Sequence, residues 1–379
     1  MQERQLVLVL NCGSSSVKYK LYEMPGRKLI SSDYLEQIKR DEYEKAIASI
    51  FEKLPLDDVS IIAHRVVHGG EAFKQSVIIT DEVKQEIDRL SRFAPLHNPI
   101  NLIGIEAAQK LRPEALHVAV FDTAFHQTMP PSSYLYAIPY EYYEKYGIRK
   151  YGFHGTSHRY VMNRAQEMME IPKEKLRLIS CHIGSGVSIT AIRYGESLDT
   201  SMGMTPLAGL SMGTRSGNID PGIIPYIEEI EGTDITGAMD VLNKRSGLLG
   251  VSGHSNDLRD VMKKAEEGDL RCQLAIDLFT TLLHKHIGLY LARLNGVDGI
   301  IFTAGIGENS PEVRQMVCAG LEFAGVILDN EANRKTKGEG FISSPYSPVK
   351  VMVIPTNEEL VMATDAYQIY ISSPEIALG

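Results

Sequence analysis

One pattern occurs twice along the chain, and it constrains the fold more than any other feature of the sequence. An apolar run over residues 6–10 is followed by a turn of small polar residues and an alternating run that ends at Tyr22. The same order returns over residues 176–192. Such runs, bounded by turn residues, predict buried strands. Two strand-turn-strand units half a chain apart predict two related domains, with a cleft faced by both turns. The alternative is that the two units are similar only by chance, because strand-turn-strand units are common.

Helical periodicity and short apolar runs alternate along the rest of the chain, which predicts an α/β protein. Its 379 residues are enough for two domains that each bury a core. Helices are expected over residues 41–54, 81–92, 100–111, 157–170, 221–230, 235–244, 257–267, 270–294, 311–323 and 357–371. Further strands are expected over residues 61–67, 118–121, 300–303 and 349–354, and a loop over 129–143.

The composition excludes several classes of protein. Hydrophobic residues make up 44% and charged residues 23%, and the formal net charge is -9. This balance is typical of a folded enzyme and argues against a uniformly basic nucleic-acid surface. The sequence contains no uninterrupted run of about 18 apolar residues, so we expect no membrane-spanning helix. The four cysteines form no CxxC pair, so we expect reduced thiols. We therefore expect a cytoplasmic protein that binds neither nucleic acid nor membrane.

Both repeated turns are candidate phosphate-binding loops. The first spans Asn11 to Lys18 and reads NCGSSSVK, and the second contains Gly184-Ser185-Gly186. Glycine lets a phosphate approach the backbone closely, and successive amides form a nest that binds anions. An ordinary hairpin loop is the alternative for each turn taken alone. Neither turn is a P-loop, because the sequence contains no GxxxxGK[ST].

Two arginines stand among glycines and small polar residues. Arg65 lies in HRVVHGG, at the end of a predicted strand, and Arg215 lies in MGTRSG. A guanidinium fork binds carboxylate or phosphate oxygens in bidentate fashion and keeps its charge. We predict that the pair holds an anionic acceptor and neutralises a moving phosphoryl group. A solvated surface arginine is the alternative for either residue alone.

Two carboxylates follow predicted strands. Asp122 comes directly after residues 118–121, and Glu358 lies in PTNEE after residues 349–354. Ligands and Mg²⁺ collect at the carboxyl ends of strands in α/β sheets. A helix cap or turn role is the alternative for each position. Both acids are therefore candidates for binding Mg²⁺, directly or through water.

Histidines and glycines mark two further segments. His154 and His158 in YGFHGTSH are four residues apart, but the intervening glycine and the absence of HExxH argue against a zinc pair. A donor to a phosphoryl oxygen fits His154 better, and His97 is a weaker case of the same kind. Residues 302–309, FTAGIGEN, offer glycines for close approach of a nucleotide, whereas Ser310 stands where a dinucleotide fingerprint needs glycine.

Taken together, these segments resemble the acetate kinase family, within the superfamily of sugar kinases and actin. The resemblance rests on NCGSSSVKY, HRVVHGGE, FDTAFHQTMP, YGFHGTSH, DTSMGMTPLAGLSMGTRSG, HSNDLRD, FTAGIGEN and PTNEE, in the family's order. It implies two RNase H-like domains with an interdomain cleft. The first comprises residues 1–126 and 360–379. The second, 127–359, binds the nucleotide and forms a homodimer. The resemblance also implies reversible in-line transfer from ATP to acetate, giving acetyl phosphate and ADP, with Mg²⁺ that Mn²⁺ can replace.

The resemblance assigns roles to individual residues. Catalysis falls to Asp122, Arg65, Arg215 and His154, with support from His97 and His182. A small apolar pocket for the acyl methyl group is formed by Val67, Leu96, Phe153 and Pro206. The nucleotide and its phosphates are bound by Asn11, Lys18, Gly184, Ser185, Gly186, Asp257, Leu258, Arg259, Gly305, Ile306, Gly307, Glu308 and Asn309. Mg²⁺ is bound by Asn11 and Glu358, and by Asp122 through water.

Alternatives remain within and beyond this family. Propionate or butyrate kinase is the first, because one methylene changes discrimination by only about 1–3 kcal/mol. A non-catalytic ATP-gated module of the same fold is the second, and the paired arginines argue against it. Ser185 stands where the family usually has Asn, and Asn218 where it often has Asp. Both departures bear on the phosphoryl donor, for which pyrophosphate is the alternative to ATP.

Overall fold

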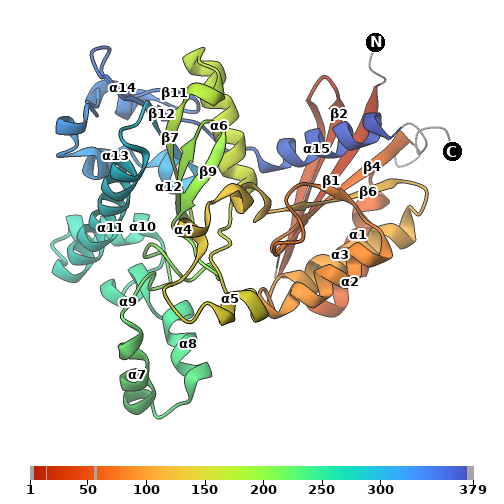
Figure 1. Ribbon diagram of the computed structural model, residues 1–379, viewed down its shortest axis with the longest axis horizontal. Coiled ribbons are helices and arrows are strands. Elements are labelled where there is room, and N and C mark those ends of the chain that lie inside the picture. The colour runs from red at the N-terminus through yellow and green to blue at the C-terminus, as the bar shows by residue number, and fades with distance from the viewer. Residues whose placement is uncertain (1–3, 14, 55–57, 374–379) are drawn as a thin grey trace. The chain divides into compact units, whose positions relative to one another are not determined.

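A computed structural model describes residues 4–13, 15–54 and 58–373, and the chain divides into two compact units (Figure 1). The first unit takes Met1–Gln127, Gly155–Tyr160 and Asn357–Gly379. The second takes Thr128–His154 and Val161–Thr356. Compactness does not test independent folding, so the predicted domain boundaries at 126/127 and 359/360 stay a prediction. None of the helices in the described residues is long and apolar enough to cross a membrane.

The first unit contains a six-stranded sheet in the order β3-β2-β1-β4-β6-β5. Its strands are β1 (Gln5–Cys12), β2 (Ser16–Met24), β3 (Lys28–Glu36), β4 (Val59–Val66), β5 (Val77–Ile78) and β6 (Leu116–Phe121). The first three strands form an antiparallel meander. β1, β4 and β6 are parallel neighbours, so their carboxyl ends lie at one edge of the sheet.

Helices cover both faces of this sheet (Figure 1), and the alternation of side chains along β1 explains why. Leu8 and Leu10 pack with residues of α1 (Tyr43–Phe51) and α3 (Asn98–Leu111). Val7 and Val9, on the opposite face, pack with α15 (Glu358–Ser372). Burying both faces removes apolar surface at about 25 cal/mol per Å². α2 (Asp81–Arg89) packs beside α3.

The second unit repeats this topology strand for strand. Its sheet has the order β11-β12-β10-β7-β8-β9, with β9-β8-β7 as the antiparallel meander and β7, β10 and β12 parallel. Reading from the meander, each position matches the first sheet, down to a short antiparallel strand at the far edge. The strands are β7 (Arg177–Ile183), β8 (Val187–Arg193), β9 (Glu196–Thr200), β10 (Gly299–Thr303), β11 (Gly340–Phe341) and β12 (Lys350–Val353). The predicted relation between two α/β halves is therefore confirmed.

The remaining helices are mostly in the second unit. They are α4 (Pro131–Tyr134), α5 (Glu141–Tyr146), α6 (Gly155–Met169), α7 (Ile224–Glu231), α8 (Ile235–Lys244), α9 (Gly247–Ser252), α10 (Leu258–Glu266), α11 (Leu270–Leu294), α12 (Ala304–Asn309), α13 (Pro311–Cys318) and α14 (Asn330–Lys335). Only the first turns of α6 belong to the first unit.

Several predicted boundaries were wrong for identifiable reasons. The helix expected over 41–54 is a 3₁₀ turn followed by α1, which ends at Phe51. The helix expected over 311–323 ends at Cys318, before Gly320 with φ +81°. The loop expected over 129–143 contains α4 and the start of α5. β3 went unpredicted because most of its side chains are exposed, which leaves no apolar run to detect.

A buried histidine pair lies between β4 and β6. His64 Nε2 is 3.0 Å from His117 Nδ1, and His117 Nε2 is 2.9 Å from the carbonyl oxygen of Arg112. The second bond makes His117 Nε2 a donor, so His117 Nδ1 accepts from His64. Burial lowers the pKa of both histidines, and the neighbouring His117 lowers that of His64 further. Both rings are therefore held neutral in the folded state.

Folding stability should consequently fall on acidification. Below the ordinary histidine pKa of 6.5 the unfolded chain binds protons that these buried rings refuse, so unfolding becomes progressively favoured. We expect His117→Asn to flatten the dependence of the urea unfolding midpoint on pH between about pH 7 and pH 5. His254→Asn, at an exposed histidine, is the control and should keep the full slope. Equal slopes in both variants would contradict this account.

Candidate active site

The parallel strands of the first unit bring three polar side chains together at one edge. Asn11 is the penultimate residue of β1, Arg65 the penultimate residue of β4, and Asp122 directly follows β6. Because β4 lies between the other two strands, Arg65 reaches both neighbours. Arg65 Nε and Nη2 donate to Asp122 Oδ1 and Oδ2 at 3.0 and 2.6 Å, and Arg65 Nη1 donates to Asn11 Oδ1 at 3.2 Å.

This ion pair is buried and held in a fixed geometry. The side chain of Asp122 is 1% exposed. Burial by itself would lower the pKa of Arg65, but Asp122 outweighs it and, with Glu358 and Glu359, raises the pKa above its usual value. The backbone is fixed as well, since the amide of Gly155 donates to the carbonyl of Asp122 at 2.9 Å. A side chain at Gly155 would collide with that carbonyl.

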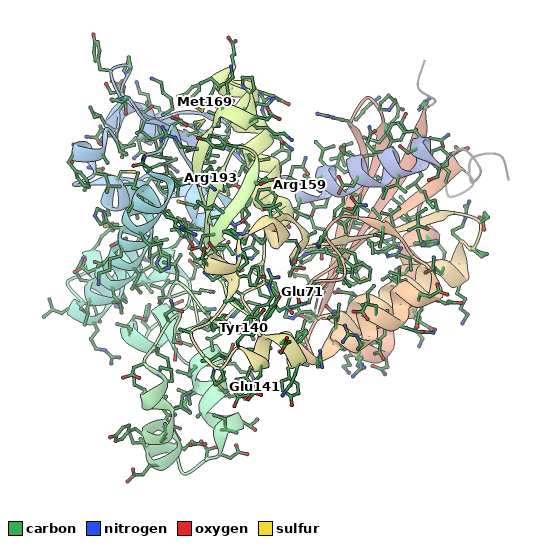
Figure 2. The ribbon with its side chains drawn as sticks, viewed as in Figure 1. Glu71, Tyr140, Glu141, Arg159, Met169 and Arg193 are labelled. Carbon is green, nitrogen blue, oxygen red and sulfur yellow. The ribbon has the colours of Figure 1, made fainter. Side chains whose placement is uncertain are left out.

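A second carboxylate lies within reach of the Arg65 charge. Glu358 begins α15, and its Oε2 accepts a hydrogen bond of 3.1 Å from Oγ1 of Thr156 in the first turn of α6. Burial raises the pKa of Glu358; the charges of Asp122 and Glu359 add to this, and Arg65 and Thr156 oppose it. Arg159, labelled in Figure 2, fastens the same turns of α6 to α15 through a 2.6 Å ion pair with Asp365.

Two lysines of β2 hold the next residue of α15. Lys18 Nζ lies 2.6 Å from Glu359 Oε1, and Lys20 Nζ lies 3.1 Å from Oε2. Burial would raise the pKa of Glu359, but the lysines outweigh burial and lower it. Asn357 Oδ1 accepts from Lys20, from the hydroxyl of Tyr22 and from the helix amide of Leu360, and so caps α15. Lys18, which we predicted to bind phosphate, is therefore engaged by a carboxylate.

The oxygen donors of the first unit fit a magnesium ion bound together with a nucleotide. Mg²⁺ prefers oxygen ligands, and at phosphate sites it uses one or two carboxylates with waters and phosphate oxygens. The available ligands are an amide oxygen from Asn11 and the carboxylates of Asp122 and Glu358. Of these two carboxylates, Glu358 is the one whose negative charge is offset least by neighbouring cations. Within residues 4–13, 15–54 and 58–373, no three histidine, cysteine or acidic side chains form a preformed metal cage.

The other predicted residues of the first unit occupy different environments. Val67 is buried, and its amide donates to Asn101 Oδ1 at 3.1 Å. Leu96 is 67% exposed, in the turn before α3. His97 is half-buried at the N-cap of α3. Their predicted roles stay predictions.

In the second unit, His154 and His182 stack on each other. Their ring centroids are 4.0 Å apart at an interplanar angle of 20°. His154 Nδ1 is 2.9 Å from the hydroxyl oxygen of Ser188 in β8. His154 adopts φ +58° at the start of α6, and a side chain at Gly186 would press on its ring. His158 instead contacts the ring of His126 within the first unit.

Arg215 differs from Arg65 in having no carboxylate partner among the described residues. Its Nη1 instead donates to the carbonyl oxygen of Pro206 at 3.5 Å and to Sδ of Met212 at 3.6 Å. Burial lowers the pKa of Arg215 without an offsetting anion. Asn218 closes the loop that carries Arg215 through two hydrogen bonds to Gly209. Its side-chain oxygen Oδ1 accepts from the backbone amide of Gly209, and its backbone amide donates to the carbonyl oxygen of Gly209. A partly buried, unneutralised guanidinium is a binding site for an anion.

A cavity of about 490 Å³ opens within the second unit. Eight residues predicted to bind the nucleotide line it: Gly184, Ser185, Asp257, Leu258, Arg259, Gly305, Ile306 and Asn309. Its apolar lining with a few polar groups is typical of a small-molecule site. Asp257 and Arg259 form an exposed ion pair at 2.5 Å, beside the N-terminus of α10.

Five residues of the same prediction do not line this cavity, namely Asn11 and Lys18 of the first unit and Gly186, Gly307 and Glu308 of the second. Glu308 Oε1 instead accepts from the amides of Ala304 and Thr356 and joins the ends of β10 and β12. Five lining residues were missed, namely Gly213, Leu248, Asn256, Met262 and Ser310. Gly213 and Asn256 lie inside segments that the sequence had singled out, MGTRSG and HSNDLRD, whereas Leu248 and Met262 carry no chemical signature.

Comparisons with known proteins agree across nearly the whole chain. Residues 34–364 match the model of the acetokinase family. A protein of Bacillus cytotoxicus named acetate kinase is 53% identical over 390 residues, which cover 96% of this chain and 98% of that protein.

Two solved structures are similar over the full length. The crystal structure of Porphyromonas gingivalis acetate kinase matches with a TM-score of 0.91 at 43% identity, covering 97% of this chain and all of the other. A propionate kinase from Francisella tularensis matches with a TM-score of 0.88 at 42% identity, covering 96% and 99%.

The buried Arg65–Asp122 pair makes a testable contribution to stability. Asp122→Asn keeps the shape of the side chain but leaves the guanidinium without its counter-charge, so we expect a loss of about 3 kcal/mol in unfolding free energy. The measurement is the urea unfolding transition of the full chain. Glu86→Gln is the matched control, because Glu86 pairs with Arg89 on an exposed helix surface and should change stability by less than about 1 kcal/mol. Similar losses in both variants would refute the assigned strength of the buried pair.

Proposed function

This chain belongs to the acetokinase family, and on that premise we propose that it phosphorylates acetate with ATP, reversibly, by direct in-line transfer to the carboxylate. The phosphorylation of acetate with ATP is the activity of the family, and the chain is a kinase with a carboxyl-group acceptor. The observation that carries the proposal is Arg215, a partly buried cation with no carboxylate partner among the described residues. An anionic acceptor or a transferring phosphoryl group would supply the missing negative charge.

The residues divide the chemistry between binding and charge stabilisation. Arg215 is free to bind an anion. Arg65 already donates hydrogen bonds from Nε and Nη2 to Asp122. Its positive charge is therefore held in a fixed orientation toward the transferring group. We propose that both arginines stabilise the charge of the transferring phosphoryl group, which is the main task of a protein in phosphoryl transfer. His154, oriented through Ser188 and stacked on His182, would donate to a phosphoryl oxygen.

The cavity of the second unit is the proposed site of the nucleotide. Its volume suits a nucleoside, and Ser185 adds a hydroxyl donor to its lining, whereas the amide of Gly184 donates within the turn to the carbonyl of Gly186. Asn218 has no part in this cavity's lining, and its amide oxygen makes a bond to Gly209 that an aspartate would also make. Of the two departures from the family pattern, only Ser185 therefore bears on the phosphoryl donor.

We propose that Asn11, Asp122 and Glu358 hold Mg²⁺. When bound, the ion would neutralise the phosphate oxygens of the nucleotide. Thr156 then has a defined task, because its hydrogen bond fixes the carboxylate of Glu358. Lys18 and Lys20 neutralise Glu359. Of the two glutamates at the start of α15, Glu358 is therefore the one that can bind a cation. Mn²⁺ offers the same preference for oxygen ligands.

Acetate is the proposed acceptor, and propionate is the alternative that the similar propionate kinase of Francisella tularensis keeps open. We propose that Val67, Leu96, Phe153 and Pro206 contact the acyl group. A homodimer through the second unit is a further proposal. It is supported by leucines spaced four apart on α11, since Leu270 and Leu274 are 84% and 58% exposed.

The proposed reaction is tested by acyl hydroxamate formation from ATP, Mg²⁺ and acetate, propionate or butyrate. We expect acetate to give the highest kcat/KM and no product without an acid. Folded protein that forms no acetyl phosphate would refute the proposal. A preference for propionate would select the alternative acceptor. ATP hydrolysis independent of any acid would favour the non-catalytic module of the same fold.

Arg215→Ala tests the anion-binding role more cleanly than a change at Arg65, because it leaves no buried carboxylate without a partner. We expect kcat to fall about a thousandfold while the ATP dissociation constant stays within about threefold, since the charge acts on the transferring group. Arg245→Ala is the control, because Arg245 pairs with Glu231 on the surface of the same unit. A parallel loss of ATP binding in the Arg215 variant would remove this assignment.

The raised pKa of Glu358 predicts how magnesium use depends on pH. A carboxylate whose pKa is raised takes up its proton at a higher pH than an ordinary glutamate, and the protonated acid does not bind Mg²⁺. The Mg²⁺ concentration for half-maximal ATP binding should therefore rise as pH falls from about 8 to about 5.5. Glu358→Gln should weaken Mg²⁺ use at every pH and flatten the profile, whereas exposed Glu312→Gln should keep it. A Glu358→Gln profile as steep as that of the unchanged protein would contradict the assignment.

A further inference from the structure

The loop that carries Pro206 and precedes Arg215 is fastened by a tyrosine outside every motif discussed above. Tyr136 lies between α4 and α5, and its hydroxyl oxygen accepts a hydrogen bond of 2.9 Å from the backbone amide of Met204. The approach is close, because a side chain at Gly203 would collide with this hydroxyl oxygen. Residue 203 therefore has to be glycine for this bond to form.

The same loop residue is joined to the segment that carries Phe153 and His154. The carbonyl oxygen of Gly203 accepts from the amides of Tyr151 and Gly152, each at 3.1 Å. The hydroxyl of Tyr136 and the two amides thus hold the two sides of one peptide group, the one that joins Gly203 to Met204. Two residues further on, the carbonyl oxygen of Pro206 contacts Nη1 of Arg215 at 3.5 Å. The bond at Met204 is therefore two residues from Pro206, which contacts Arg215, and its peptide group is bonded to Gly152, the residue before Phe153.

Tyr136 can act as an anchor because its own backbone neighbourhood is fixed. The amide of Lys150 donates to the carbonyl of Tyr134 at 2.7 Å. The guanidinium of Arg149 stacks over the Tyr134 ring, with its carbon 3.6 Å from the ring centroid. These contacts join residue 134 to the segment that leads to Phe153. A rigid base on one side and a glycine loop on the other are what a positioning contact requires.

We propose that Tyr136 is a positioning residue that sets the selectivity for the acid: its hydroxyl fixes the 203–206 loop and, through it, Pro206 and Arg215. The inference rests on the proposed function, because Pro206 and Arg215 receive the acid there. Loss of the hydroxyl leaves the amide of Met204 without this partner, so that only the bonds to the Gly203 carbonyl still hold this peptide group, and the loop is held less firmly. The acid then binds less tightly and the small pocket discriminates less between acetate and propionate, while the nucleotide cavity, lined by other residues, is unaffected.

Tyr136→Phe removes one oxygen atom and keeps the ring, so the fold should be retained. Tyr140→Phe is the matched control, because Tyr140, labelled in Figure 2, belongs to the same tyrosine-rich segment and is 61% exposed. In the Tyr136 variant we expect KM for acetate to rise about tenfold, and KM for ATP to stay within about twofold. The ratio of kcat/KM for acetate over propionate should fall by about threefold or more. The control should match the unchanged protein in all three quantities.

Two results would overturn the inference. One is an acetate KM in the Tyr136 variant equal to that of the control. The other is an equal rise in KM for acetate and ATP together with a lower melting temperature, which would mark a general structural role. Hydrogen exchange provides a readout that needs no catalysis: the amides of Gly203, Met204 and Thr205 should exchange faster in Tyr136→Phe than in the control. If the unchanged protein does not phosphorylate acids, the proposed function is wrong. The positioning contact is tested separately: it is wrong if the Met204 amide exchanges at the same rate in Tyr136→Phe and in the unchanged protein.

Discussion

The bidentate contact between Arg65 and Asp122 is the interaction on which the first unit's site depends. It exists because β1, β4 and β6 are parallel neighbours, which brings the ends of three chain segments to one edge of the sheet. A buried carboxylate at this position is tolerable only when a cation neutralises it, and the cation in turn is kept rigid by the carboxylate. Glu358 then adds a charge that the first unit only partly offsets. The site therefore combines an oriented cation with a carboxylate suited to a metal ion.

The duplicated topology shows how one architecture serves two tasks. In the second sheet, His182 occupies the penultimate position of β7, as Asn11 does in β1. By strand register, the places equivalent to Arg65 and Asp122 are taken by Thr303 and Thr356, which are uncharged. The second sheet's edge therefore carries no charge pair at these positions. Its turn at Gly184 and the helix after β10 instead line the cavity proposed for the nucleotide.

The sequence predicted those features whose cause is local. Apolar runs located every parallel strand, and helix α11 was predicted to the residue. In the structure, Asn295 in the left-handed conformation follows the end of this helix. Glycine and arginine motifs located eight lining residues of the cavity. The sequence could not reveal that Lys18 pairs with Glu359, because the partners are separated by most of the chain. Tyr136 was missed for a similar reason. Gly203 is required because the Tyr136 hydroxyl lies against it, and this contact between distant residues is visible only in the structure.

The central claim of this account is that Arg65 and Arg215 act on the same transferring phosphoryl group. A double-mutant cycle on kcat/KM for acetate, with Arg65→Lys, Arg215→Lys and the double variant, tests it most directly, since lysine keeps the charge and loses the fork. Two residues that stabilise one transition state act as a unit, so the double variant should lose far less than the product of the two single losses. Single losses that simply multiply would show two independent roles and contradict the account.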